Sequence, residues 1–156
     1  MAIGSVHPLS VRLRSPRETL SGYVILPRLI DKVRLHAQGK LPSDYVENLL
    51  KPGLTLDGRF LTFTGLDGEA LREAILSAKT DEEILAWVEK HARPRSEEEK
   101  RQWAEAIDAY RPDPAYAERR KQIYRELAEK IDVAAVSVLD LIDMDEGRVP
   151  CRVQRS

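Results

Sequence analysis

Apolar residues recur at helical spacing along most of the chain, and the clearest case is the stretch that follows Pro27. At about 100° per residue, five apolar side chains fall on one face of a helix over residues 28–38. They are Leu26, Leu29, Ile30, Val33 and Ala37. Pro27 is suited to a first helical turn and Gly39 to the end of the helix. The pattern therefore predicts a helix with one face buried in a core.

Capping residues place further helices along the chain. Ser, Thr and Asp accept hydrogen bonds from the free N–H groups of a first helical turn, and glycine and proline mark the ends. We predict a short helical turn at 15–22 and helices over 42–50, 57–65, 67–78, 80–92, 96–110 and 113–130. The predicted caps include Ser15, Asp57, Asp67, Thr80, Ser96 and Asp113. These helices are joined by short loops, as is usual in compact helical domains.

The segment 132–143 has two interpretations. Its apolar residues occupy every side of a helical wheel, whereas Val136, Val138 and Asp140 also alternate as in a strand. We favour a buried helix, because no other clear strand offers a partner. The predicted fold is all-α or mostly α, with seven to eight helices and at most one short strand-like segment. It forms a single domain over residues 15–147, between an irregular segment 1–14 and a tail 148–156.

Composition and charge narrow the class of protein. The 42% hydrophobic and 33% charged residues are typical of a soluble globular protein. Cys151 is the one cysteine, so no disulfide can form within the chain. No apolar run reaches the roughly 18 residues of a membrane span, and the N-terminus lacks the apolar core of a signal peptide. We therefore expect a cytoplasmic protein with no membrane partner.

The near-neutral net charge of −1 conceals an asymmetry. Residues 1–40 hold seven cations against two acids, a net charge of +5, and residues 132–147 hold five acids and no Lys or Arg. We favour pairing of these segments, within one subunit or across a homo-oligomer. The alternative is a basic site for a small anionic ligand. Nucleic-acid binding is not favoured, because the basic segment lacks interleaved aromatic residues.

The second face of the helix at 28–38 carries candidate chemistry. Arg28 and Asp31 are three residues apart and can pair there. Leu35 lies opposite the apolar stripe with Lys32 beside it, so Leu35 and Lys32 are the interface candidates, expected to be covered by a loop or a second subunit. The alternative is an anion-binding Arg28 oriented by Asp31.

Further candidates for ligand binding flank this helix. They are Tyr23 before it, His36 at the edge of its apolar face, and Asp57 with Arg59 in the turn of the segment DGRF. We expect Asp57 to cap the short helix that follows it. A small-molecule site would require Tyr23, Arg28 and Asp31 to converge with these residues on one pocket.

Metal and cofactor sites are not predicted. The three histidines have no metal-ligand spacing, and no glycine-rich phosphate loop or nucleophile motif occurs. For the acidic run Asp140, Asp143, Asp145 and Glu146 we favour pairing with cations such as Arg148 over cation binding. Arg120 lies within the apolar stripe of the helix at 113–130, and we expect its guanidinium to reach an acid or an aromatic ring.

Four blocks of the sequence resemble a known family. SPRETLSGYVILPRLIDKVR, LDGRFLTFTGL, DEEILAWVEKHARPRS and LDLIDMDEG follow in order from Ser15 to Gly147. They are similar to successive blocks of the mostly bacterial domain of unknown function 5069 family. The resemblance implies a single-domain cytoplasmic protein and transfers no catalytic residues. We expect a non-enzymatic binding or assembly module; the alternative is a small-molecule-binding protein or enzyme with a pocket around Tyr23, Arg28 and Asp31.

Overall fold

The structure, a computed structural model, describes residues 13–148 as nine helices and one two-stranded antiparallel sheet. Residues 1–12 and 149–156, with most of the predicted terminal segments and Cys151, lie outside the described residues. The described residues divide into two compact units on either side of the Ala104–Glu105 bond. The expected single domain over 15–147 stays a prediction, and each unit is described by itself.

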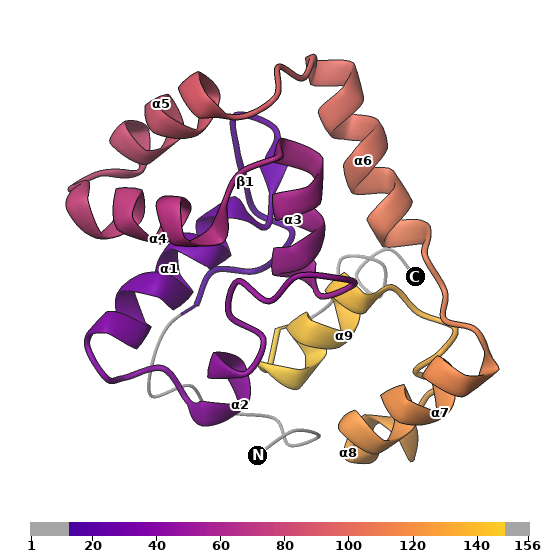
Figure 1. The fold of residues 1–156 in the computed structure, drawn as a ribbon. Coiled ribbons are helices and arrows are strands. Elements are labelled where there is room, and N and C mark those ends of the chain that lie inside the picture. The colour runs from indigo at the N-terminus through magenta and orange to yellow at the C-terminus, as the bar shows by residue number, and fades with distance from the viewer. Residues whose placement is uncertain (1–12, 149–156) are drawn as a thin grey trace. The chain divides into compact units, whose positions relative to one another are not determined.

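The first unit contains the sheet and most of the helices (Figure 1). Its elements are β1 (Thr19–Leu20), β2 (Tyr23–Val24), α1 (Leu26–Ala37), α2 (Ser43–Val46), α3 (Leu56–Thr64), α4 (Gly68–Ser77) and α5 (Asp81–His91). Helix α6 (Glu97–Ala109) runs across the division. The second unit continues with α7 (Pro114–Ile123), α8 (Arg125–Ala128) and α9 (Val138–Asp145). The mostly helical fold class is confirmed.

Local sequence signals place most helix starts correctly. The side chains of Asp67, Thr80 and Asp113 accept hydrogen bonds from backbone N–H groups in the first turns of α4, α5 and α7. At α6, Ser96 and Glu99 form a reciprocal capping box: each side chain accepts from the other's backbone N–H, at 3.0 and 2.8 Å. These caps form through contacts only three residues apart, which explains why the sequence reveals them.

The predicted helical turn at 15–22 is wrong, because a β-hairpin forms there. Thr19 pairs with Val24 and Leu20 with Tyr23, so Ser21 and Gly22 form a two-residue turn. Their φ angles of 50° and 86° are both positive, as a type I′ hairpin turn requires. Ser15 accepts from the Arg17 N–H, which closes a turn ahead of β1 instead of starting a helix.

The predicted long helix at 113–130 is interrupted at Tyr124. Its φ of −112° and ψ of 56° are not helical, so α7 ends and α8 begins at this residue. The segment 132–143 is neither wholly helix nor strand: turns occupy its first part, and α9 starts only after Ser137. Neither boundary carries a glycine or proline to announce it.

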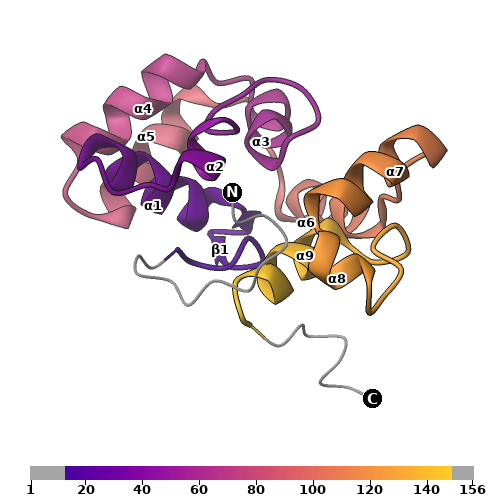
Figure 2. The same ribbon diagram turned by 90° about the horizontal axis from the view of Figure 1, so that it is seen from below.

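The core of the first unit lies where α1, α4 and α5 pack together, as both ribbon views show (Figures 1 and 2). Eight apolar side chains from these three helices have no exposed surface: Leu26, Leu29, Ile30, Val33, Leu71, Ile75, Ile84 and Val88. Burying one such side chain contributes about 1.5–3 kcal/mol relative to leaving it in water. The predicted apolar stripe of α1 is therefore its core face, except that Ala37 is exposed at the last turn.

Helix α1 begins from a strained residue. Ile25 is fully buried and has a φ of 76°, a conformation that β-branched side chains rarely adopt. Its N–H donates to the Pro16 carbonyl at 3.1 Å, and its own carbonyl accepts from the Leu29 N–H at 2.9 Å. Such a conformation costs about 1–3 kcal/mol, which the burial of the surrounding apolar side chains offsets.

In the second unit, arginine side chains hold the turns that precede α9. Arg120 is 4% exposed, and its guanidinium donates to the Val133 and Val136 carbonyls at 3.2 Å each. Arg111 donates to the Ala135 carbonyl at 3.0 Å. Arg120 therefore satisfies backbone carbonyls, instead of the acid or aromatic ring expected from the sequence. Burial lowers the pKa of Arg120.

Candidate functional site

A buried ion pair links α1 to α3. The Lys32 ammonium lies 2.8 and 3.0 Å from the two carboxylate oxygens of Asp57, whose side chain is 1% exposed. One of those oxygens also accepts from the Leu50 N–H at 2.8 Å. Asp57 therefore does not cap α3; Thr55 does, because its hydroxyl accepts from the Gly58 N–H at 3.0 Å.

The loop that enters α3, residues 50–56, is fastened to the first turn of this helix. Besides the Asp57 contact with Leu50, the Thr55 hydroxyl donates to the Lys51 carbonyl at 2.7 Å, and Arg59 Nε donates to the Leu54 carbonyl at 3.2 Å. Together with the Thr55 cap, these contacts involve the side chains of Thr55, Asp57 and Arg59, which are the residues of the TLDGR segment that can form side-chain hydrogen bonds. We name residues 50–56 the fastened loop.

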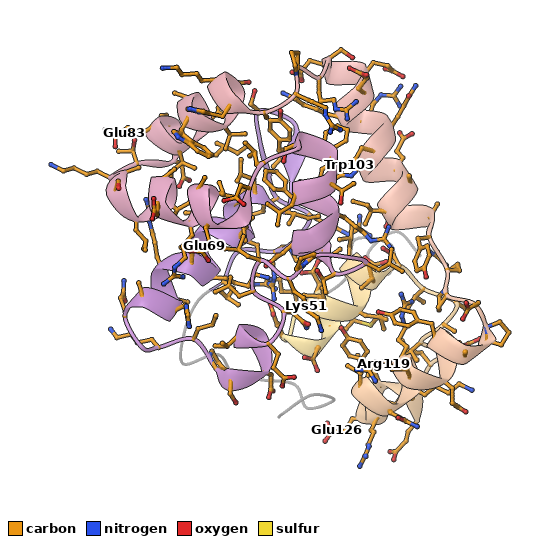
Figure 3. The ribbon with its side chains drawn as sticks, viewed as in Figure 1. Lys51, Glu69, Glu83, Trp103, Arg119 and Glu126 are labelled. Atoms are coloured by element: carbon orange, nitrogen blue, oxygen red, sulfur yellow. The ribbon has the colours of Figure 1, made fainter. Side chains whose placement is uncertain are left out.

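Gly58 makes this loop geometry sterically accessible. A Cβ at this position would lie 2.5 Å from the Gly53 carbonyl oxygen and 2.7 Å from the Lys51 carbonyl oxygen. Since such distances are far below van der Waals contact, any larger residue would push the loop away from α3. Figure 3 labels Lys51 on the path of this loop toward α3. The loop presents Leu54, which is 63% exposed, the largest value among the exposed large apolar residues of the described chain.

A second charged cluster joins α1 to α5 through Arg14. Its guanidinium donates to Asp31 at 3.0 and 3.1 Å and to Asp81 at 2.6 Å. The Arg14 N–H also donates to Asp31, at 2.8 Å. These hydrogen bonds raise the pKa of Arg14, and the bond from Arg14 lowers the pKa of Asp81. Asp31 therefore pairs with Arg14, and the predicted Arg28–Asp31 pair is wrong.

The remaining candidates of α1 have different surroundings. Arg28 is 5% exposed, donates to the Arg14 carbonyl at 3.2 Å, and lies 5.7 Å from the centre of the Tyr45 ring. Leu35 is half-buried, which leaves its predicted interface role untested. His36 Nδ1 lies 3.2 Å from a guanidinium nitrogen of Arg72 on α4.

Tyr23 belongs to an aromatic cluster that the sequence analysis missed. Its ring contacts Phe60 and Phe63 edge to face, and Phe63 stacks on Trp103 with ring centres 4.4 Å apart. Trp103 is labelled on α6 in Figure 3. Burial, followed by the negative charge of Glu89, raises the pKa of the Tyr23 hydroxyl. The residues come from three segments distant in sequence, so the only local signal was the three-residue spacing of Phe60 and Phe63 in the LDGRFLTFTGL block, which puts both rings on one side of a helix.

Two cations cover the faces of these rings. The Lys100 ammonium lies 4.2 Å from the centre of the Tyr23 ring and donates to the Ser21 carbonyl at 2.9 Å, with its residue only 3% exposed. The Arg95 guanidinium lies 4.5 Å from the Phe63 ring centre and donates twice to the Phe63 carbonyl. Lys100 thus clamps the hairpin to α6, and Arg95 closes the C-terminal end of α3.

A surface groove of about 380 Å³ lies between the hairpin and the first half of α6. Gly22, Val24 and Ala104 provide apolar surface, and Thr19 lies with them. The polar lining comes from Glu97, Glu98 and Arg101, of which the last two pair with each other. We name this feature the hairpin groove.

Two members of the acidic run near the end of the described chain, Asp143 and Glu146, pair with Arg148, a cation that the sequence suggested. The Arg148 guanidinium lies 3.2 Å from an Asp143 oxygen and also pairs with Glu146. Within residues 13–148, no group of three or more His, Cys, Asp or Glu side chains is arranged to hold a metal ion.

The structure thus gives the predicted ligand residues partners within the protein. It brings Lys32 and Asp57 into contact, and it links Arg28 to the Arg14 cluster through a backbone carbonyl. Tyr23 and His36 have other partners, an aromatic cluster and Arg72. The described geometry is that of a helical scaffold held by internal charge pairs, with the fastened loop and the hairpin groove at its surface.

Comparison with known proteins identifies the family. The sequence model of the domain of unknown function DUF5069 matches residues 10–148, so the chain belongs to this family. A search of curated proteins found no match. None of the helices in the described part of the chain is long and apolar enough to cross a membrane.

Proposed function

We propose that this protein is a non-enzymatic binding and assembly module that self-associates through the fastened loop. The observation that carries the proposal is Leu54. Leu54 is 63% exposed in the loop before α3, and burying it against a partner would be favourable. Single exposed apolar residues are common on protein surfaces. Leu54 differs because hydrogen bonds fix the loop that carries it.

The loop holds Leu54 in a fixed position. Hydrogen bonds from or to Thr55, Asp57 and Arg59 fix the loop on both sides of the leucine, and Gly58 lets the backbone approach closely. A contact residue that is already ordered loses little conformational entropy on binding. The predicted acidic ligand residues also support a binding role for the surface elements. Asp57 pairs with Lys32 and Asp31 pairs with Arg14, so both carboxylates already have partners inside the protein.

A second copy of the chain is the partner that we propose. The chain carries segments of opposite net charge, +5 over residues 1–40 and −5 over 132–147, which favours attraction between copies. A single loop buries less surface than the roughly 1,200 Å² of a standard stable interface, so we expect weak, concentration-dependent association.

The test is sedimentation velocity of the full chain over a wide range of concentrations. We expect the mean mass to rise with concentration, and Leu54→Ser to shift this rise to roughly tenfold higher concentration or more, since burial of a leucine contributes about 1.5–3 kcal/mol. Leu76→Ser is the matched control, because Leu76 is also an exposed leucine, 43% exposed, but lies on α4. A strict monomer at every concentration would overturn the proposal, as would equal effects of the two variants.

A further inference from the structure

The hairpin groove and the fastened loop have complementary surfaces. The groove has apolar surface from Val24, Gly22 and Ala104, as a leucine side chain requires. Its volume of about 380 Å³ exceeds that of one leucine side chain and leaves room for part of the loop backbone. Leu54 in the fastened loop is exposed, and binding in an apolar groove would remove its side chain from water.

The charges beside the two surfaces are also complementary. The groove lining holds two carboxylates, Glu97 and Glu98, against one cation, Arg101, which is already paired with Glu98. Glu97 is 80% exposed at the side chain, and its contact with the Lys100 ammonium is long, at 3.5 Å. Glu97 is therefore available to a further cation.

The loop carries that cation. Lys51 is exposed, stands three residues before Leu54, and forms no ion pair within the described residues. Its backbone is fixed, because its carbonyl accepts from the Thr55 hydroxyl at 2.7 Å and packs against Gly58. The Lys51 side chain thus extends from a fixed backbone position three residues before the exposed leucine.

We infer that the fastened loop of one copy docks into the hairpin groove of a second copy, with Leu54 on the apolar lining and Lys51 beside Glu97. This inference rests on the proposed self-association and names the surfaces that perform it. Both surfaces belong to the first unit, so each copy offers one loop and one groove. Opposite charges at the edge of such a contact set the register of docking and accelerate encounter more than they add affinity.

Zero-length cross-linking of a mixture tests the docking directly. Full-length chains labelled with light and heavy nitrogen are mixed, and a carbodiimide joins amines to carboxylates that are in contact. We expect a light-to-heavy peptide pair that links Lys51 to Glu97 or Glu98. Peptide pairs between copies that never include Lys51 would overturn the inference.

Charge exchange provides the second test, by sedimentation velocity. Lys51→Glu and Glu97→Lys should each weaken association roughly two- to fivefold, as expected of exposed charges, and the combined variant should restore it. Lys90→Glu on α5 is the control, because Lys90 is exposed and does not line the groove. Thermal melts establish that each variant is folded.

The outcomes separate this inference from the proposed function. Self-association that depends on Leu54 but ignores both charge reversals, with cross-links outside the groove, overturns the groove as the acceptor and leaves self-association standing. A monomeric wild-type chain overturns both. Restoration by the combined variant supports both.

Discussion

The Lys32–Asp57 pair yields the sharpest prediction for stability. Asp57 is 1% exposed at its side chain and Lys32 is 10% exposed, so the pair is shielded from water and salt. In Asp57→Ala the Lys32 ammonium loses this carboxylate inside the protein. Removing one partner of a buried pair costs about 3–5 kcal/mol, because the other charge stays desolvated and loses its ionic hydrogen bonds to that partner. For a chain of this length that corresponds to a fall in Tm of roughly 6–20 °C.

A second substitution separates the charge from the hydrogen bond. Asp57 also accepts from the Leu50 N–H, and the amide oxygen of Asp57→Asn can keep that bond while the charge is lost. We therefore expect Asp57→Ala to be less stable than Asp57→Asn by about 1–3 kcal/mol, the cost of an unsatisfied buried donor. The double variant Lys32→Met with Asp57→Asn should recover part of the loss of Asp57→Asn, since it also removes the buried ammonium that has lost the Asp57 charge.

The assay is urea denaturation followed by circular dichroism, with Glu98→Ala as the control. Glu98 pairs with Arg101 at side-chain exposures of 56% and 57%, and water and salt screen such a surface pair, so it contributes little to stability. The reasoning is refuted if Asp57→Ala loses no more free energy of unfolding than this control. It is also refuted if Lys32→Met worsens the Asp57→Asn variant.

Three further predictions follow from the same structure. Gly58→Ala should destabilise by at least about 1–3 kcal/mol in urea denaturation, although alanine is the better helix former, because its Cβ would meet the Gly53 carbonyl oxygen at 2.5 Å; a gain in stability would contradict the packing. Ser21→Asn should raise the free energy of unfolding by about 1 kcal/mol, since asparagine tolerates the positive φ of the hairpin turn; an unchanged Tm would contradict the type I′ geometry. The hydrogen bond from Arg14 holds the pKa of Asp81 below its unfolded value of about 3.9, so the stability that the pair contributes is present above that pH and is lost as pH falls through the folded pKa. The difference in unfolding free energy between wild type and Asp81→Asn should therefore shrink on acidification below about pH 4, and a constant difference would refute the pairing.

Local signals in the sequence predicted the helices well where the physics is local. Caps at Asp67, Thr80, Ser96 and Asp113 act over three residues, and the apolar stripe of α1 follows from the helical repeat alone. The same reasoning failed at the Ser15–Gly22 segment. A glycine such as Gly22 can end a helix or form a type I′ hairpin turn, and the pairing of β1 with β2 selected the hairpin.

The charged residues show the limit of sequence reasoning more clearly. The three-residue spacing predicted that Arg28 pairs with Asp31. Arg14 pairs with Asp31 instead, because the chain ahead of the hairpin passes beside α1. The Arg14 guanidinium also reaches Asp81. Spacing also made Asp57 a helix cap. Its carboxylate instead pairs with Lys32, 25 residues earlier in the chain. A desolvated charge is stabilised by an opposite charge that lies beside it in the folded structure, and that partner can be far away in the sequence.

The sequence by itself thus determined the family and the helical class. It also determined that the helix predicted at 28–38 has an apolar core face and a charged opposite face. Only the tertiary structure decided which charges form ion pairs inside the protein and which groups remain at the surface. Leu54 and Gly58 illustrate the reason. Nothing in their local pattern marks one as exposed and the other as a steric requirement, because both properties arise where a loop returns to pack against its own helix.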